Sequence, residues 1–211
     1  LAEKKFRIEK DSMGELKVPA EAKWGAQTQR AIDNFQISDH KMPAGFIRSL
    51  SLLKWGISNA NKDLGLLPKE KASAIADAAM EIYEGSHFSE FPLDVFQTGS
   101  GTSTNMNMNE VISNLSSTDL NPVHPNDHVN MGQSSNDVIP SAINVDAALT
   151  VTNSLIPSMR HLKNSIEEKA KSIGDVPKNG RTHLMDAMPI TFTQEMSAWS
   201  AQIKDAIKQY E

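Results

Sequence analysis

Residues 133–174 read QSSNDVIPSAINVDAALTVTNSLIPSMRHLKNSIEEKAKSIG, and this stretch decides the fold. Its apolar side chains recur every three or four residues, which is the spacing of one face of an α-helix. This apolar stripe consists of Ile139, Ile143, Ala147, Val151, Leu155, Met159, Leu162, Ile166 and Ile173. Pro157 inside the stripe predicts a break or kink, and Gly174 ends it. The stripe is more apolar than one short polypeptide can cover, which favours packing into a helical bundle, including packing between subunits.

Shorter helical patterns lie on both sides of this stretch. Proline before and glycine after an apolar repeat are typical helix boundaries. The predicted helices are residues 44–64, 69–84, 102–115 and 191–210, the last with a capping box of Thr191 and Gln194. Residues 176–189 indicate an irregular crossing or a short hairpin. We expect a mainly α fold in which a mostly helical N-terminal domain, 1–136, precedes the beginning of a central helical-bundle domain, 137–211. Because no stop signal follows Tyr210, the pattern also predicts a truncated chain.

The composition excludes several classes of protein. The 211 residues are 39% hydrophobic, enough to bury a core, and carry a formal net charge of −5. This balance disfavours nucleic acid as a partner, and no apolar run approaches the roughly 18 residues of a membrane span. The sequence has no cysteine, which excludes disulfides, thiol nucleophiles and thiolate metal sites. We expect a cytoplasmic protein that binds neither nucleic acid nor membrane.

A run of 88 residues, from Ala72 to Met159, holds no lysine or arginine but ten acidic residues and ten asparagines. An acidic, solvated surface would explain the charges, but the asparagines gather with Ser, Thr and Gly in two clusters. The first is Gln97-Thr-Gly-Ser-Gly-Thr-Ser-Thr-Asn105, a glycine-rich turn that leads into a helix. Unpaired N–H groups at such a helix start suit a carboxylate or phosphate oxygen. The cluster lacks the Gly-Lys-Ser/Thr of a phosphate-binding loop, which disfavours nucleotide, and an ordinary capped loop is the alternative.

The second cluster joins His124-Pro-Asn-Asp127-His128 to Gln133-Ser-Ser-Asn-Asp137. Helix capping explains one or two of the polar residues at 134–136 but not the whole run. The histidines at 124 and 128 could share a metal ion. The intervening proline argues against a regular helix, however, and no third ligand has suitable spacing, so we expect no metal site.

His183 differs from the other histidines because it lies in an irregular segment, Gly180–Pro189, between two long helices. A rigid scaffold can present such a residue to a cleft. The reference pKa of a histidine side chain, about 6.5, makes this residue type suited to proton transfer near neutrality. A structural role is the alternative for a single histidine.

Taken together, these segments resemble the class II fumarate hydratases of the fumarase/aspartase superfamily. The segments that carry the resemblance are Phe6-Arg-Ile-Glu-Lys-Asp-Ser-Met-Gly14, Trp24-Gly-Ala-Gln-Thr-Gln-Arg30, Phe91-Pro-Leu93, Gln97-Thr-Gly-Ser-Gly-Thr102, Asn105-Met-Asn-Met-Asn-Glu-Val111, His124-Pro-Asn-Asp127, Gln133-Ser-Ser-Asn-Asp137 and Gly180-Arg-Thr-His183. They follow in order along nearly the whole chain, so a chance match is excluded.

The resemblance implies a lyase that catalyses the reversible hydration of fumarate to (S)-malate in the tricarboxylic acid cycle without a cofactor. It implies a mostly helical, three-domain subunit, so this chain would lack the C-terminal part and the third domain. It also implies a homotetramer in which three subunits build each active site.

The same resemblance implies roles for individual residues. His183 would be the catalytic histidine. The residues that would hold the substrate carboxylates are Ser100, Gly101, Thr102, Ser134, Ser135, Asn136 and Thr182. A second, peripheral dicarboxylate site would consist of His124, Pro125, Asn126 and Asp127.

Three departures from the family pattern stand out. The family's serine-bearing loop, which supplies the proposed base and a substrate-binding lysine, is not in this sequence, so the chain alone is expected to be catalytically incomplete. Asn121 stands where many relatives carry an arginine of the peripheral site, and Met131 where many carry lysine.

Two alternatives stay open at this point. Aspartate ammonia-lyase belongs to the same superfamily but typically has Gln in place of His183 and Ser-Thr-Asn in place of Ser134-Ser-Asn136; Ser103-Thr104-Asn105 leans slightly toward it. The other alternative is a non-catalytic helical assembly fragment.

Overall fold

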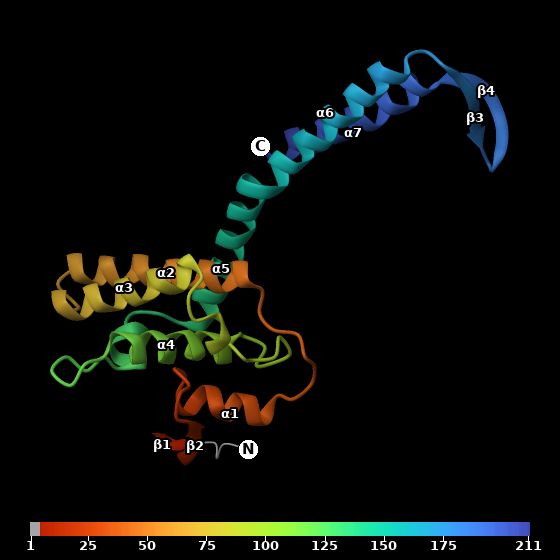
Figure 1. Cartoon of the computed structure of the whole chain (residues 1–211). Coiled ribbons are helices and arrows are strands. Elements are labelled where there is room, and N and C mark those ends of the chain that lie inside the picture. The colour runs from red at the N-terminus through yellow and green to blue at the C-terminus, as the bar shows by residue number, and fades with distance from the viewer. Residues whose placement is uncertain (1–4) are drawn as a thin grey trace. The chain divides into compact units, whose positions relative to one another are not determined.

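The computed structural model describes residues 5–211, and most of its elements are helices, which confirms the mainly α fold (Figure 1). The chain forms two compact units, the first ending at Asp146 and the second beginning at Ala147. The domain boundary predicted between residues 136 and 137 stays a prediction. No helix within residues 5–211 has the length and hydropathy needed to cross a membrane.

The first unit is built on three helices, α2 (Ala44–Asp63), α3 (Lys69–Glu84) and α4 (Thr102–Ser116). Their bounds agree with the apolar spacing to within a residue. Gly85 ends α3 in the left-handed conformation, with φ of +112°, which a residue without a Cβ adopts at little cost.

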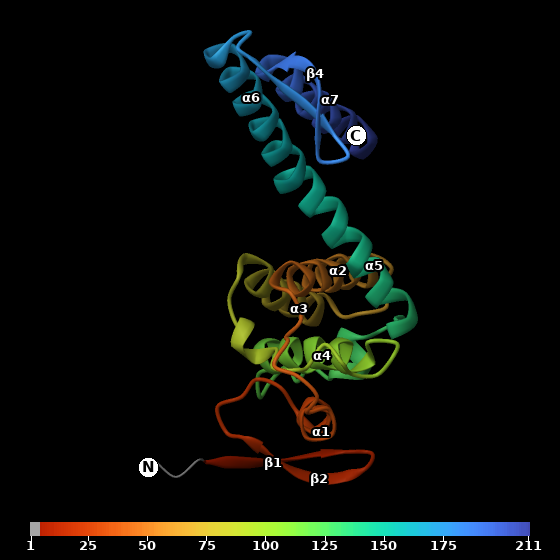
Figure 2. The same ribbon diagram turned by 90° about the vertical axis from the view of Figure 1, so that its right-hand side faces the viewer.

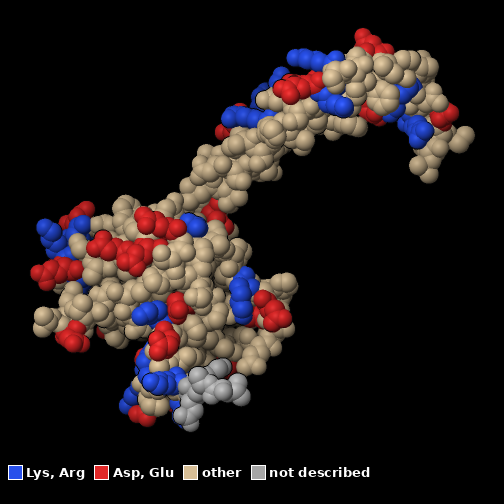
Figure 3. Space-filling view, in the orientation of Figure 1, with Lys and Arg blue, Asp and Glu red and all other residues tan. Residues whose placement is uncertain are grey.

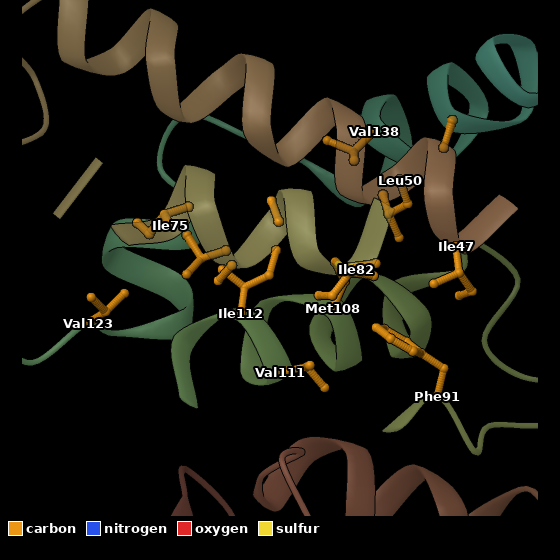
Figure 4. Packing of buried hydrophobic residues seen from close by; sticks show 14 of the residues in the cluster. Ile47, Leu50, Ile75, Ile82, Phe91, Met108, Val111, Ile112, Val123 and Val138 are labelled. Atoms are coloured by element: carbon orange, nitrogen blue, oxygen red, sulfur yellow. The ribbon is translucent and has the colours of Figure 1, made fainter. Parts of the chain in front are cut away.

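The core of the first unit lies where these helices meet (Figure 4). Leu50 from α2 packs with Ile75 and Ile82 from α3, and α4 contributes Met108 and Ile112. All five side chains are at most 1% exposed. Burying a side chain of this size contributes about 1.5–3 kcal/mol relative to leaving it in water, so these helices are held chiefly by their shared apolar faces.

Helix α5 (Ser135–Thr150) adds Val138 and Ala142 to this core. It follows a 3₁₀ turn, η1 (Phe88–Glu90), and a π-helical turn, η2 (Pro125–Val129), along the chain. The second of these turns lies in a stretch for which the apolar pattern gives no helix.

The N-terminal segment contains elements that the helical pattern did not predict. Strands β1 (Phe6–Asp11) and β2 (Gly14–Pro19) form an antiparallel hairpin next to helix α1 (Ala26–Asn34) (Figure 2). The guanidinium of Arg7 donates to the carbonyl oxygens of Ala22 and Trp24, both at 2.6 Å, and so binds the chain that links β2 to α1. These contacts are local and polar, which is why apolar spacing does not reveal them.

Glu110 on α4 binds the start of α1. Its carboxylate accepts from the backbone N–H of Gly25 at 2.9 Å, of Gln27 at 2.8 Å and of Thr28 at 3.1 Å, and from the Thr28 hydroxyl at 2.6 Å. The first N–H groups of a helix have no partner within the helix and carry a partial positive charge. A Cβ on Gly25 would lie 3.0 Å from the Glu110 carboxyl carbon, so glycine allows this close approach.

The second unit pairs α6 (Ile156–Ile173) with α7 (Phe192–Tyr210). A hairpin of β3 (Pro177–Thr182) and β4 (Met185–Thr191) joins them, which confirms the hairpin alternative for this segment. A π-helical turn, η3 (Val151–Leu155), precedes α6, and Pro157 lies in the first turn of α6, where the sequence predicted an irregularity. The capping box at the start of α7 is confirmed.

We predict that Glu110→Gln lowers the free energy of unfolding by about 1–3 kcal/mol, because the carboxylate offers two acceptor oxygens to the four donors at the start of α1, whereas an amide offers only one. Urea denaturation followed by circular dichroism measures the change. The exposed Glu84, at the end of α3, provides the control variant Glu84→Gln, for which we expect a change within about 0.5 kcal/mol. Equal effects of the two substitutions would contradict the role given to Glu110.

Candidate functional site

The turn before α4 holds the first group of candidate residues. Gly101 is left-handed, with φ of +69°, and Ser100 Oγ lies 2.7 Å from Thr102 Oγ1. Ser100 and Thr102 are exposed. The N–H groups of Ser103 and Thr104 donate to side chains of the preceding turn, at 3.4 and 2.9 Å. Because one hydroxyl of the Ser100–Thr102 pair donates to the other, one hydroxyl proton of the pair remains for a ligand.

The start of α5 holds the second group. Ser134 Oγ accepts from the N–H of Asn136 at 3.3 Å and so caps the helix, a role expected for one or two of the three residues. Ser135 Oγ accepts from Asn105 Nδ2 at 3.0 Å. Asn136 is exposed, and no hydrogen bond of its side chain occurs within the part of the chain that the structure describes.

Two contacts bring these groups together in the first unit. Besides the bond from Asn105 on α4 to Ser135, Gly101 packs against Ile139 of α5, since a Cβ on Gly101 would lie 3.0 Å from Ile139 Cγ2. The starts of α4 and α5 are therefore neighbours. Hydroxyl and amide donors from two separate stretches of sequence gather in one region.

A buried lysine lies beneath this region, and the sequence analysis missed it. Lys54 on α2 is 1% exposed. Its ammonium donates to Asn105 Oδ1 at 2.7 Å, to Gln133 Oε1 at 2.7 Å and to Asn130 Oδ1 at 3.2 Å. Burial lowers the pKa of Lys54 to about 7. Within residues 5–211, no carboxylate forms an ion pair with it.

The amides around Lys54 also bind one another. Asn130 Oδ1 accepts from Asn105 Nδ2 at 3.1 Å and from Asn109 Nδ2 at 3.2 Å, and Gln133 Nε2 donates to the carbonyl oxygen of Val129 at 2.8 Å. Each bond restricts the rotation of the next side chain. The network therefore fixes the turn that leads into α5.

The sequence did contain a signal that Lys54 is buried. Leu50, Lys54 and Ser58 recur every four residues on the buried face of α2. A lysine in phase with the core positions of a helix is rarely buried without a partner, and here the partners are the asparagines and the glutamine of the lysine-free run. The run from Ala72 to Met159 contains no lysine or arginine, so the blue side chains in Figure 3 belong to other parts of the chain. The buried cation next to the starts of α4 and α5 comes from α2.

The predicted proton-transfer histidine lies in the second unit. His183 and Leu184 form the two-residue turn between β3 and β4, and both have positive φ, +49° and +60°. Such a conformation costs a residue with a side chain about 1–2 kcal/mol. Thr182 and His183 are exposed, and Leu184 is fully exposed. Strained and solvent-facing turns of this kind occur at functional sites.

The predicted peripheral site lies at η2. His124 Nδ1 accepts from the N–H of Asp127 at 3.2 Å, and His128 Nδ1 accepts from the N–H of His124 at 2.8 Å. Burial, helped by Lys71, lowers the pKa of His128. A cavity of about 460 Å³ lies beside this turn, and its lining includes Lys10, Gln27, His124, Pro125 and Asn126.

The comparisons with known proteins agree on one family. The family model described as lyase matches residues 14–211. A class II fumarate hydratase of Xylella fastidiosa is 56% identical over 203 residues, which cover 96% of this chain and 43% of that protein. The class II fumarate hydratase of Corynebacterium glutamicum is 52% identical over 211 residues, or 100% of this chain and 45% of that protein.

Solved structures give the same result. Recombinant class II fumarase from Schistosoma mansoni is similar with a TM-score of 0.91 and 40% identity, covering 97% of this chain and 44% of that one. A fumarate lyase:delta crystallin from Brucella melitensis has a TM-score of 0.90 and 39% identity, covering 97% of this chain and 50% of that one. The chain spans about half the length of the relatives it matches.

We predict that the burial of Lys54 makes stability depend on pH. An unfolded lysine has a pKa of about 10.4, so between pH 7 and that value the unfolded chain holds a proton that the folded chain has lost. The free energy of unfolding should then rise with pH, at most by roughly 1.4 kcal/mol per pH unit. Urea denaturation from pH 6.5 to 9.5 measures the slope.

Lys54→Met should remove this slope. Lys62→Met is the matched control, because Lys62 is on the same helix and also binds an amide oxygen, that of Asn59 at 2.7 Å, but is only half-buried. A slope that survives in Lys54→Met would contradict the prediction.

Proposed function

This chain belongs to the lyase family, and from that premise we propose that the whole protein catalyses the reversible hydration of fumarate to (S)-malate. The observation that supports the proposal most is that two helix starts are neighbours, one with Ser100 and Thr102 and the other with Ser134, Ser135 and Asn136. Uncharged hydroxyl and amide donors suit carboxylate oxygens, and the relatives' names, fumarate hydratase and fumarase, support a four-carbon dicarboxylate as the proposed substrate class.

The chemistry of the proposed reaction needs such donors. In the dehydration direction, a base removes a weakly acidic proton from the carbon next to a carboxylate. The electron pair moves into that carboxylate, which becomes an aci-carboxylate with additional negative charge. When the pair returns to form the double bond, the hydroxyl on the adjacent carbon leaves as water with a proton donated by a general acid of the site. Donors directed at that group stabilise the charge where it develops, which lowers the barrier. Thr102, Ser135 and Asn136 are the residues we assign to this task.

His183 and Thr182 are proposed to complete the site from another subunit of a homotetramer. The exposed, strained turn that carries His183 suits presentation to a neighbouring copy. We further propose that the base and a substrate-binding lysine come from a serine-bearing loop outside residues 1–211. The chain alone would then bind substrate in part and lack turnover.

The turn at His124, Pro125, Asn126 and Asp127 is proposed as a second dicarboxylate site. Asn121 removes the positive charge that many relatives have there. The cavity beside the turn includes Lys10, which supplies a cation from β1 instead. The lining of this cavity also includes three carboxylates, and each is engaged: Glu9 by Arg7, Asp11 by Arg30 and Glu110 by the start of α1.

Aspartate ammonia-lyase activity is disfavoured by the placement of the residues that lean toward it. Of Ser103, Thr104 and Asn105, the last two are 1% exposed and bind Gln97 and Ser135, so they do not face a ligand; Ser103 is partly exposed, with its hydroxyl 3.4 Å from that of Thr98. Incubation with fumarate and with aspartate separates the two activities. Malate formation without ammonia release is expected, and ammonia release from aspartate would overturn the proposal.

We predict that Asn136→Ala in the whole protein lowers kcat by about 10²–10³, the usual effect of removing one donor to developing negative charge. The loss of fumarate absorbance in the ultraviolet measures turnover. Asn144→Ala, an exposed change on the same helix, is the control and should leave kcat within about twofold. If Asn136→Ala raised KM and left kcat intact, Asn136 would bind the substrate and the transition state equally well. The proposal that it stabilises the transition state specifically would then be wrong.

We predict that His183→Ala and Ser135→Ala proteins complement each other when their subunits are mixed. If the two residues reach each site from different subunits, random mixing leaves about a quarter of the sites with both residues intact. Each variant alone should be nearly inactive. Refolding the variants together and measuring malate formation tests this, and mixtures no more active than their parents would show that one subunit supplies both residues.

A further inference from the structure

The direction of the Ser135 hydroxyl proton decides what this residue can do. A serine hydroxyl has one proton to donate and two lone pairs that accept. Ser135 Oγ accepts a hydrogen bond from Asn105 Nδ2 at 3.0 Å. This contact occupies a lone pair, so the single proton stays available for a partner on the outer side.

The orientation of the Asn105 amide depends on Lys54. In its protonated form the Lys54 ammonium has only donors, so the group that faces it at 2.7 Å must be the amide oxygen. The amide nitrogen then has to face the other way, toward Ser135 at 3.0 Å and Asn130 Oδ1 at 3.1 Å. If the amide were rotated by half a turn, its NH₂ group would meet the ammonium and its oxygen would attract the serine proton inward.

The remaining contacts of Lys54 hold it in place. Its other two acceptors, Gln133 Oε1 at 2.7 Å and Asn130 Oδ1 at 3.2 Å, match the other two ammonium protons. The side chain is 1% exposed, so water does not replace any of the three. Breaking any one of these hydrogen bonds would leave a proton of the buried charged group without an acceptor. The free-energy cost is larger than the contribution of a neutral hydrogen bond.

We propose that Lys54 is a positioning residue of the dicarboxylate site: through Asn105 it compels Ser135 to accept from within the protein and to donate its hydroxyl proton to the substrate carboxylate. The inference rests on the proposed function of Ser135 in fumarate hydration. Lys54 itself lies below the site and touches no substrate atom.

A purely structural lysine and a positioning lysine predict different results. A structural lysine would affect stability, and any loss of activity would be independent of what stands at residue 135. A positioning lysine acts through the hydroxyl of Ser135, so its loss matters only while that hydroxyl is present. Coupling between the two substitutions therefore separates the two roles.

The test is a double-mutant cycle in the whole protein with fumarate as substrate. Lys54→Met and Ser135→Ala should each lower kcat/KM by about tenfold or more, and the double variant should be within about threefold of Ser135→Ala. Losses that multiply in the double variant would overturn the inference. Lys62→Met, on the same helix, should keep wild-type kcat/KM.

A second cycle removes the dependence on how well Lys54→Met folds. Asn105→Asp keeps an oxygen for Lys54 but has no N–H group for Ser135, so it should lower kcat/KM as much as Lys54→Met does, and again have little effect in the Ser135→Ala background. Thermal unfolding and gel filtration establish that each variant is folded and assembled. Asn105→Asp with wild-type activity would also overturn the inference.

The wild-type protein separates this inference from the proposed function. A wild type that does not interconvert fumarate and malate overturns the proposed function and the role of Lys54 with it. An active wild type in which the cycles show no coupling overturns only the role of Lys54.

Discussion

The ammonium of Lys54, on α2, donates hydrogen bonds only to amide oxygens. These belong to one residue of α4 and to two residues of the turn before α5. A buried charge of this kind is tolerated when every proton has an acceptor, and removal of one acceptor costs more than removal of a neutral hydrogen bond. The contacts therefore tie α2, α4 and the beginning of α5 into one arrangement. The placement of the Ser135 hydroxyl and of the polar turn before α5 depends on that arrangement.

The buried face of α4 carries polar side chains that lower its stability. Asn105, Asn107 and Asn109 are each at most 1% exposed, where apolar residues would pack more favourably. Within residues 5–211, the side-chain oxygens of Asn107 and Asn109 accept no hydrogen bond. Buried polar groups that need particular partners restrict a helix to one register, since a shift would leave more of them unpaired. We interpret α4 as a helix whose stability is lowered in favour of a fixed geometry at its N-terminal end.

Much of the fold could be predicted from the sequence because apolar periodicity reports directly on which face of a helix is buried. The predicted α2, α3 and α4 agree with the structure, and so does the capping box at Thr191. The hairpin of β1 and β2 and helix α1 were not predicted, because the contacts that hold them, such as those of Arg7, join polar groups without a sequence period.

The candidate site was predictable in its residue types but not in its internal connections. Clusters of Ser, Thr and Asn at helix starts indicated donors for an anion, and the structure places those at α4 and α5 side by side. Lys54 could not be assigned to them, because it precedes Asn105 by 51 residues and only the packing of α2 on α4 brings the two together. Chain separation of this size is invisible to local patterns.

His183 is held in a different physical environment from the donors of the first unit. Its turn has two residues with positive φ, a geometry whose twist matches the flanking strands and which therefore keeps the hairpin stiff. The apolar residues near it, Leu184 and Met188, are 102% and 81% exposed, which is unfavourable for a surface in water. Covering them with another copy of the chain would gain the free energy of apolar burial and would order the imidazole at the same contact. In the proposed tetramer, assembly and the placement of the histidine would then depend on the same side chains, so that a site divided between subunits needs no additional interaction to form.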